Sequence, residues 1–155
     1  MSGIQPLDMK VVSKLMRYCA YRERSKKEVI QKLQSLGVGF SDPYLDYLTN
    51  NNYLNFSRYA HAFALGKFRI NKWGKQKIKQ ALHLNGVDHD LINTAVSSIN
   101  DEDYTITLNS LAKNKLKDIK GKNEFEIRSK ASRYLISKGY EPELIKQALD
   151  GLLKD

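Results

Sequence analysis

The sequence contains one cysteine, three prolines and no long apolar run. A single cysteine, Cys19, cannot form an internal disulfide, which fits a reducing compartment. No apolar stretch reaches the length of about 18 residues that a membrane-spanning helix needs, and the N-terminal MSGIQPLDMK does not resemble a signal peptide. We therefore expect a cytoplasmic protein that does not enter a membrane.

Motifs for catalysis and metal binding are also missing. His61, His83 and His89 show no ligand spacing with one another or with Cys19, and no cysteine pair is available for zinc. The sequence has no phosphate-binding GxxxxGK[ST] loop, no GxSxG elbow and no GxGxxG fingerprint. Cys19 shares an apolar helical stripe with Leu15 and is expected in the core. We expect no enzyme activity, no cofactor and no metal site.

Acidic residues are absent from the middle of the chain, where none occurs between Asp46 and Asp88. The formal net charge of +9 is therefore uneven. Residues 1–55 carry 8 basic and 5 acidic side chains, residues 56–100 carry 7 and 2, and residues 101–155 carry 11 and 10. Such an excess favours nucleic acid, an anionic membrane surface or an acidic protein face as partner.

Three segments of the sequence can be superposed: EVIQKLQSLGV (28–38), KIKQALHLNGV (77–87) and KASRYLISKGY (130–140). Each has a leucine four residues before a glycine and an apolar residue eight before it. The leucines are Leu33, Leu82 and Leu135, and the glycines are Gly37, Gly86 and Gly139. This spacing predicts the apolar face of a helix that ends at a glycine in the left-handed conformation.

A helical pattern precedes each of these segments and another follows it. No sustained period-2 alternation indicates a strand. We therefore predict an all-α protein of three tandem three-helix repeats, stacked into an elongated, curved array that shares a continuous core. The predicted units are residues 1–55, residues 56–100, which are the most basic, and residues 101–155.

Two strings carry a resemblance to a known family: YCAYRERSKKEVIQKLQSLG, and NNYLNFSRYAHAFALGKFRINKWGKQKIKQALHLNGV. With the closing YLISKGYEPELIKQAL, they resemble the RecX family of bacterial recombinase regulators over nearly the whole chain. Asn55 and Phe56 stand where the family has an acidic pair, so the next helix is expected to be capped by Asn55 or Ser57. Tyr21 also replaces a smaller residue.

The resemblance implies a non-catalytic regulator that binds the nucleoprotein filament of the RecA recombinase on DNA. It implies that the protein restrains ATP hydrolysis and strand exchange by RecA in recombination and DNA repair. The expected partners are the RecA filament and nucleic acid, the latter contacted through phosphates, and the expected state is a monomer without membrane association. Composition and spacing alone show only a helical array with a basic centre.

The candidate binding residues lie mainly in KFRINKWGKQKIKQ, residues 67 to 80, which holds six cations and no carboxylate. They are Lys67, Arg69, Lys72, Lys75, Lys77 and Lys79, together with Arg22 and Arg24 in the first unit. Lys72, Lys75 and Lys79 have the i, i+3, i+7 spacing of one helical stripe, opposite the apolar Ile78 and Leu82. Because no glutamate compensates these charges, the stripe indicates anion binding. A merely solvated face is the alternative.

Several neighbouring residues have structural explanations. Lys67 and Arg69 suit the C-terminal end of a helix, where cations interact favourably with its dipole. Trp73 could stack on an unpaired base, but a tryptophan ahead of a helix more often packs between helices. Gly74 is expected to permit a tight entry into the next helix. The basic stretch at 113–123 indicates a mobile connector.

Two other functions fit the same sequence. One is a free-standing nucleic-acid-binding repeat protein that needs no protein partner. The other is an interaction scaffold whose basic face meets an acidic protein. An ATPase assay of RecA on single-stranded DNA separates these possibilities.

Overall fold

The computed structural model describes residues 6–154, which form helices joined by short turns. Within this range there are nine helices and no strand, so the all-α prediction is confirmed. The helices are α1 (Met9–Tyr21), α2 (Lys26–Ser35), α3 (Asp42–Asn50), α4 (Phe56–Asn71), α5 (Lys75–Leu84), α6 (His89–Ser97), α7 (Asp101–Asp118), α8 (Glu124–Ser137) and α9 (Pro142–Leu152).

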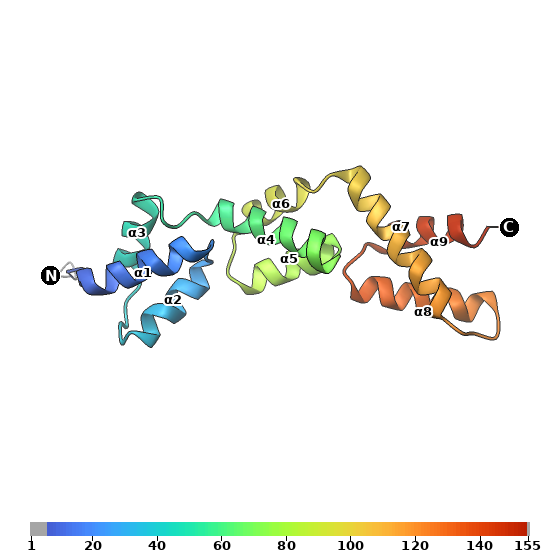
Figure 1. Cartoon of the computed structure of the whole chain (residues 1–155), viewed down its shortest axis with the longest axis horizontal. Coiled ribbons are helices and arrows are strands. Elements are labelled where there is room, and N and C mark those ends of the chain that lie inside the picture. The colour runs from blue at the N-terminus through green and yellow to red at the C-terminus, as the bar shows by residue number, and fades with distance from the viewer. Residues whose placement is uncertain (1–5, 155) are drawn as a thin grey trace.

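The helices are arranged in three units of three, set end to end along an elongated molecule (Figure 1). Unit 1 contains α1–α3, unit 2 contains α4–α6 and unit 3 contains α7–α9, and the two termini lie at opposite ends. The predicted array of three-helix repeats is therefore confirmed. The residue boundaries that we assigned to the units stay a prediction.

The three aligned glycines end the second helix of each unit in the left-handed conformation. Gly37, Gly86 and Gly139 have φ angles of 80°, 79° and 102°. In each unit the residue after the glycine donates its N–H to the carbonyl of the aligned leucine, at 2.9 Å, 3.1 Å and 3.2 Å in chain order. This 6→1 bond is the one that defines the Schellman motif. The repeated Leu-x-x-x-Gly spacing therefore encodes a helix end.

Asparagine and serine side chains start several of the helices. Asn55 Oδ1 accepts the N–H of Arg58 at 3.0 Å, which makes Asn55 the cap of α4 in place of the acidic pair. Asn100 and Asn123 cap α7 and α8 in the same way. At α2, Ser25 forms a full capping box with Glu28.

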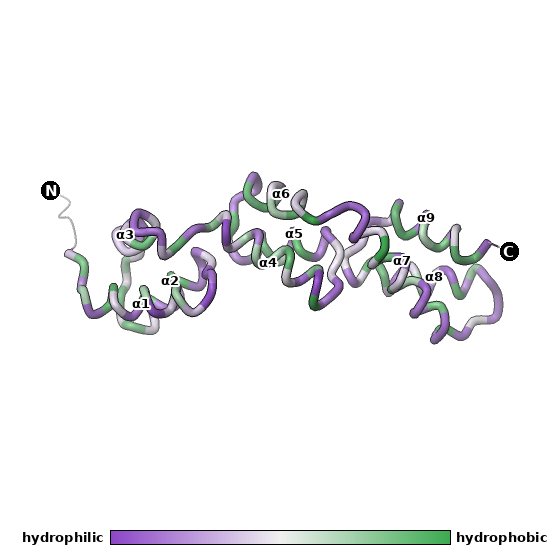
Figure 2. The backbone as a smooth tube through the Cα atoms, turned by 45° about the horizontal axis from the view of Figure 1, so that its top comes forward, coloured by the Kyte–Doolittle hydropathy of each residue, from purple (hydrophilic) through white to green (hydrophobic). Residues whose placement is uncertain are grey.

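The hydrophobic core is not continuous, contrary to our expectation. Unit 1 has its own cluster, which includes Leu15, Leu33 and Tyr44. A second cluster runs through units 2 and 3 together. Hydrophobic segments occur in every helix along the chain (Figure 2), so composition does not explain the division. The division of the core follows from the closer approach of units 2 and 3 to each other than of units 1 and 2.

The junction between units 2 and 3 is built from main-chain atoms. Gly74 N donates to Lys138 O at 2.7 Å, and Gln76 N donates to Gly139 O at 2.9 Å. The turn between α4 and α5 therefore lies directly on the turn between α8 and α9. A Cβ on Gly74 would lie under 3.0 Å from the main chain of Gly139. The φ of Gly74, −78°, is ordinary, so the close approach of the two main chains is what requires glycine at the entry into α5.

Two buried tyrosines tie the same junction from the side of unit 3. The Tyr140 hydroxyl donates to Lys72 O at 2.9 Å. The Tyr104 hydroxyl accepts the N–H of Lys75 at 2.9 Å and donates to the Glu141 carboxylate. Burial, followed by the hydrogen bond to Glu141, raises the pKa of Tyr104, so this phenol stays a donor. Units 2 and 3 therefore form one packed body.

The junction between units 1 and 2 is made by side chains. Arg58 Nε lies 3.0 Å from Glu23 Oε1, and Arg58 Nη1 donates to Asn52 Oδ1 at 2.7 Å. Lys27 Nζ reaches Leu84 O at 3.4 Å. Solvated contacts of this kind contribute little stability each. We expect unit 1 to unfold with some independence from the rest.

The capping box of α2 allows this independence to be tested. Glu28 accepts from Ser25 N at 3.0 Å and from Arg22 at 2.5 Å. Burial opposes ionisation of Glu28, but these hydrogen bonds outweigh it and lower the pKa of the carboxyl. Glu28→Ala is expected to cost unit 1 about 1 kcal/mol, as for other lost caps. Glu28→Gln should cost less because glutamine keeps the capping contact.

Circular dichroism and tryptophan fluorescence should report different unfolding transitions in denaturant, because the only tryptophan lies in unit 2. Far-UV circular dichroism should show an earlier transition for Glu28→Ala, while the Trp73 fluorescence transition stays unchanged.

The stability of unit 1 should also depend on pH through Glu28, because the pKa of this carboxyl is lower in the folded protein than in the unfolded chain. The ionised carboxylate therefore stabilises the fold fully above its unfolded pKa of about 4.3. This stabilisation is lost as the pH falls through the folded pKa. The gap between wild type and Glu28→Gln should close there. A shift of both probes together would mean that the units unfold as one.

Candidate anion-binding surface

The turn between α4 and α5 carries the centre of the basic segment. Lys72 ends α4 in the left-handed conformation, with φ of 58°, a strained position for any residue other than glycine. Trp73 N then donates to Lys67 O at 3.1 Å, and Gly74 begins the entry into α5. Lys72 is therefore not part of α5, and the predicted stripe of Lys72, Lys75 and Lys79 on one helix is wrong.

Three of the lysines in this segment lie against aromatic rings. Lys67 Nζ and Lys77 Nζ lie 5.0 Å and 4.7 Å from the centre of the Trp73 ring. Lys75 Nζ lies 4.7 Å from the ring centre of Tyr104. Cation–π contacts of this kind are worth about 0.5–1 kcal/mol at exposed sites. We call Lys67, Lys75 and Lys77 the ring-contacting lysines.

Trp73 itself is only partly exposed and packs against the core shared by units 2 and 3. Two ammonium groups occupy its ring surface, so the indole helps to position cations. This arrangement agrees with the packing interpretation of Trp73, and it leaves little of the ring for a base.

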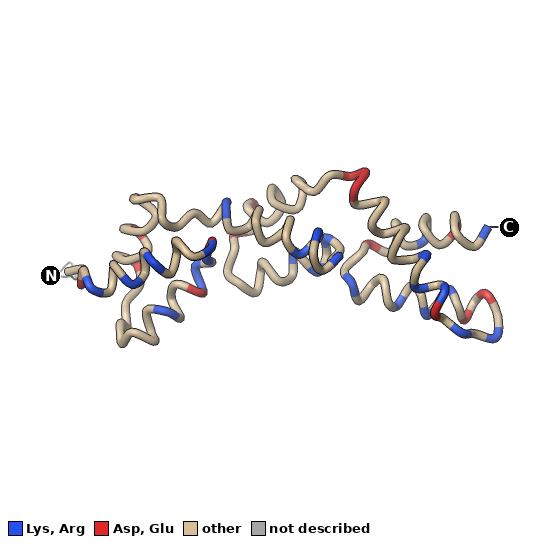
Figure 3. The backbone as a smooth tube through the Cα atoms, in the orientation of Figure 1, with Lys and Arg blue, Asp and Glu red and all other residues tan. Residues whose placement is uncertain are grey.

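The other three cations of the segment point away from the core. Arg69 and Lys72 are exposed, and Lys79 of α5 is half-exposed. None of the three forms an ion pair with any residue in the described range. We call Arg69, Lys72 and Lys79 the projecting cations. Figure 3 shows the basic residues gathered where α4 meets α5, with no acidic residue in either helix.

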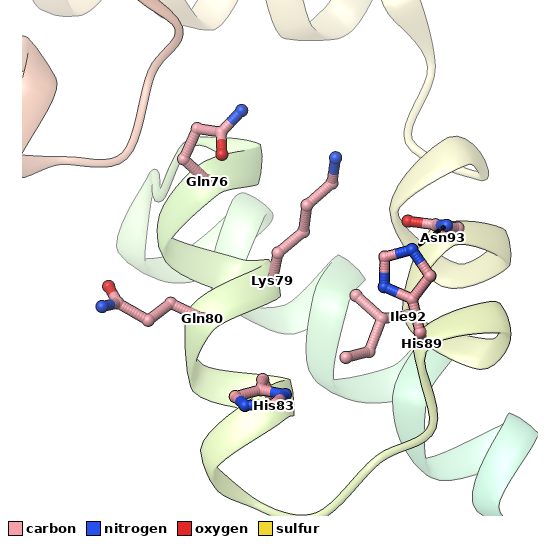
Figure 4. Close-up of a pocket in the computed structure, with 7 residues that line it drawn as sticks. All are labelled: Gln76, Lys79, Gln80, His83, His89, Ile92 and Asn93. Atoms are coloured by element: carbon pink, nitrogen blue, oxygen red, sulfur yellow. Dashed lines mark hydrogen bonds between the residues drawn. The ribbon is translucent and has the colours of Figure 1, made fainter.

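Lys79 also borders a cavity of about 500 Å³ between α5 and α6, the α5–α6 cavity (Figure 4). Its polar lining consists of Gln76, Lys79, Gln80, His83, His89 and Asn93, with Ile92 at its apolar base. Amide, imidazole and ammonium groups supply many donors, and no carboxylate lines the cavity. Asn93 Nδ2 lies 3.1 Å from His89 Nε2.

This cavity was not predicted from the sequence, although the residues that α5 contributes to it share a recognisable pattern. Gln76, Gln80 and His83 have the helical spacing of one face that continues past Lys79. The residues of α6 could not be assigned to the same cavity without the packing of α5 on α6. The chemistry of the lining suits an anion held by several neutral donors and one cation.

Arg22 and Arg24 of unit 1 are both engaged within the protein. Arg22 pairs with Glu28 at 2.5 Å. The Arg24 guanidinium lies 3.7 Å from the ring centre of Tyr18, and its Nε donates to Tyr18 O at 2.9 Å. The Arg24 side chain is only 11% exposed. These contacts hold the turn between α1 and α2, and a role for either arginine in binding stays a prediction.

Other predictions can be compared directly with the structure. Cys19 is buried in the core of unit 1, as expected, and burial raises the pKa of its thiol to about 11. The stretch 113–123 is not a connector throughout, because α7 continues to Asp118. Within residues 6–154 no group of three His, Cys, Asp or Glu residues could hold a metal ion. None of the helices in this range is long and apolar enough to cross a membrane.

Comparison with known proteins gives a consistent result. The model for the second three-helix domain of RecX matches residues 57–96, and the model for the third matches residues 101–149. The regulatory protein RecX of Clostridioides difficile is 29% identical over 146 residues, which cover 94% of this chain and 69% of that protein. The regulatory protein RecX of Staphylococcus haemolyticus is 28% identical over 158 residues, which cover 94% of this chain and 59% of that protein.

Solved structures show the same fold. The crystal structure of RecX from Lactobacillus salivarius matches with a TM-score of 0.83 and 22% identity, covering 93% of this chain and 95% of that one. A second crystal structure of a regulatory protein RecX has a TM-score of 0.83 and 19% identity, covering 97% and 81%. At these identities the likeness concerns the arrangement of the helices.

Proposed function

The chain belongs to the RecX family of regulatory proteins, and from this premise we propose that it regulates RecA by binding the RecA filament on DNA. It acts by occupying a surface and performs no chemistry itself. In this proposal the projecting cations contact phosphates or acidic side chains in the filament. Binding restrains the ATP hydrolysis and strand exchange of RecA.

The observation that carries the proposal is the unpaired charge of unit 2. The projecting cations form no ion pair among the described residues, and Lys72 Nζ donates only to a main-chain carbonyl, Arg69 O, at 2.7 Å. The ring-contacting lysines, in contrast, are held against aromatic rings. An elongated array suits a long, repetitive partner because successive units present surface along one direction. A filament of protein on DNA is such a partner.

The test is ATP hydrolysis by RecA on single-stranded DNA with increasing amounts of this protein. We expect hydrolysis to fall as the filament becomes occupied, and we expect replacement of the three projecting cations by glutamine to weaken that effect. Replacement of Lys113, Lys117 and Lys122 in unit 3 by glutamine is the matched control, since it removes the same charge from exposed positions. Hydrolysis that never responds to the wild-type protein would refute regulation of RecA.

One observation favours a second function, that of a nucleic-acid-binding protein that acts without RecA. The α5–α6 cavity is lined by donors and needs no protein partner to hold an anion. In that case binding to free DNA should equal binding to the filament, and RecA hydrolysis should change only through competition for DNA. Tight binding to the filament with feeble binding to free DNA would exclude it.

A further inference from the structure

Unit 1 contains a second basic hollow, far from the segment at 67–80 along the chain. A cavity of about 570 Å³ is lined by Lys14, Arg17 and Tyr18 of α1, Arg24 of the following turn and Lys32 of α2. Four of the five lining residues are cations and none is acidic. We call this the unit-1 pocket. Of its members, only Arg24 was a candidate on sequence grounds.

The fold of unit 1 brings these side chains together. Lys14, Arg17 and Tyr18 have the i, i+3, i+4 spacing of one face of α1, while Leu15 and Cys19 point into the core. The Tyr18 ring organises the floor of the pocket. Arg24 lies 3.7 Å from its centre, and Lys32 Nζ, from the neighbouring helix, lies 5.4 Å from it.

Glu23 and Glu28 of unit 1 leave three of the four cations of the pocket without an ion pair. Glu23 pairs with Arg58 of unit 2 at 3.0 Å. Glu28 pairs with Arg22 at 2.5 Å and reaches only Arg24 within the pocket, at 3.6 Å. Lys14, Arg17 and Lys32 form no ion pair with any residue between 6 and 154. Like charges gathered without compensation repel, so the folded state gains nothing from this arrangement unless an anion enters.

We propose that the unit-1 pocket binds phosphodiester groups of a single-stranded nucleic acid. The three cations that have no ion pair, Lys14, Arg17 and Lys32, exceed what a single side-chain carboxylate needs, whereas successive phosphates along a strand supply several negative charges. A second aromatic ring adjoins the pocket, because the Arg24 guanidinium lies 5.8 Å from the ring centre of Tyr21 as well as 3.7 Å from that of Tyr18. Tyr21 is 84% exposed at the end of α1, where an unstacked base could lie on it.

This inference deepens the proposed function by giving unit 1 its own contact with the DNA strand, but the contact itself does not require RecA. Units 1 and 2 have separate cores and are joined by side chains, so each unit brings its own basic surface to the strand. Two sites along one elongated molecule would hold a strand more tightly than either alone.

The experiment is fluorescence anisotropy of a labelled single-stranded oligonucleotide, titrated with the full chain over a range of salt, without RecA. Replacement of Lys14, Arg17 and Lys32 by glutamine is expected to weaken binding at least tenfold. The slope of log K against log salt should fall by about 2, since each lost phosphate contact removes about 0.7 for single strands. Tyr21→Ala should weaken binding about tenfold and leave the slope unchanged, because stacking releases no counterions.

The control removes Lys113, Lys117 and Lys122 of unit 3, and it should leave affinity and slope nearly unchanged. A strand with neutral methylphosphonate linkages should bind wild type and pocket variant equally. Equal binding of an ordinary strand by wild type and pocket variant would overturn the inference. So would a loss seen only on the RecA filament, which would assign the pocket to acidic side chains of RecA. The pocket variant could also bind the free strand more weakly while the wild-type protein leaves RecA hydrolysis unchanged. That result would support the inference about the unit-1 pocket and refute regulation of RecA.

Discussion

Replacement of Gly139 by alanine is expected to destabilise the body formed by units 2 and 3 by about 3 kcal/mol or more. Two costs combine at this position. The φ of 102° lies in the region where a Cβ costs about 1–2 kcal/mol. The added Cβ would also fall 2.7 Å from Lys77 N and 2.9 Å from Gly74 O, where overpacking costs about 1–3 kcal/mol more.

The chain provides a matched control for the conformational cost alone. Gly37 ends α2 with a φ of 80°, yet nothing would lie within 4 Å of a Cβ placed there. Gly37→Ala should therefore cost only about 1–2 kcal/mol. Gly74→Ala isolates the other cost, because its φ of −78° is unstrained while its Cβ would press on the main chain of Gly139.

The measurement is denaturant unfolding followed by Trp73 fluorescence and by circular dichroism. Gly139→Ala and Gly74→Ala should lower the midpoint of the fluorescence transition, because both act on the junction beside Trp73. Gly37→Ala should act on the circular dichroism transition of unit 1 alone. If Gly139→Ala cost no more than Gly37→Ala, the close approach of the two turns would contribute nothing to stability.

The local architecture was largely predictable because it is encoded by short-range patterns. The Leu-x-x-x-Gly repeat predicted three helix ends, and all three glycines have the required φ. The Ser25-x-x-Glu28 spacing is the sequence signature of a capping box, and the structure has this box at the start of α2. These features depend on residues within one or two helical turns, so a single sequence contains all the information that they need.

The division of the core and the grouping of the cations could not be predicted in the same way. That Gly74 meets Gly139 depends on how two units dock, and no pattern along the chain relates these positions. A lysine has the same local sequence signal whether its ammonium lies on a ring or in solvent. The basic segment was therefore identified correctly as a region, while the helical stripe assigned within it was wrong.

The last prediction concerns which cations of unit 2 bind. Replacement of the projecting cations Arg69, Lys72 and Lys79 by glutamine should weaken binding to DNA or to the RecA filament at least tenfold. Replacement of the ring-contacting lysines Lys67, Lys75 and Lys77 removes the same charge but should weaken binding much less. Each of their ammonium groups lies within 5.0 Å of the ring centre of Trp73 or Tyr104, and this contact restrains its reach toward a ligand.

The same two variants should rank in the opposite order in their effect on the free energy of unfolding. Substitutions at exposed positions usually change the free energy of unfolding by no more than about 0.5 kcal/mol each, so the first variant should unfold much like wild type. The second variant loses its cation–π contacts and should cost about 1.5–3 kcal/mol in total. Salt titrations of both variants complete the test, because each lost phosphate contact should reduce the slope of log K against log salt by about 0.7 to 0.9. Equal losses of affinity and slope in the two variants would show that unit 2 attracts anions through its total charge, with no distinction between projecting and ring-contacting side chains.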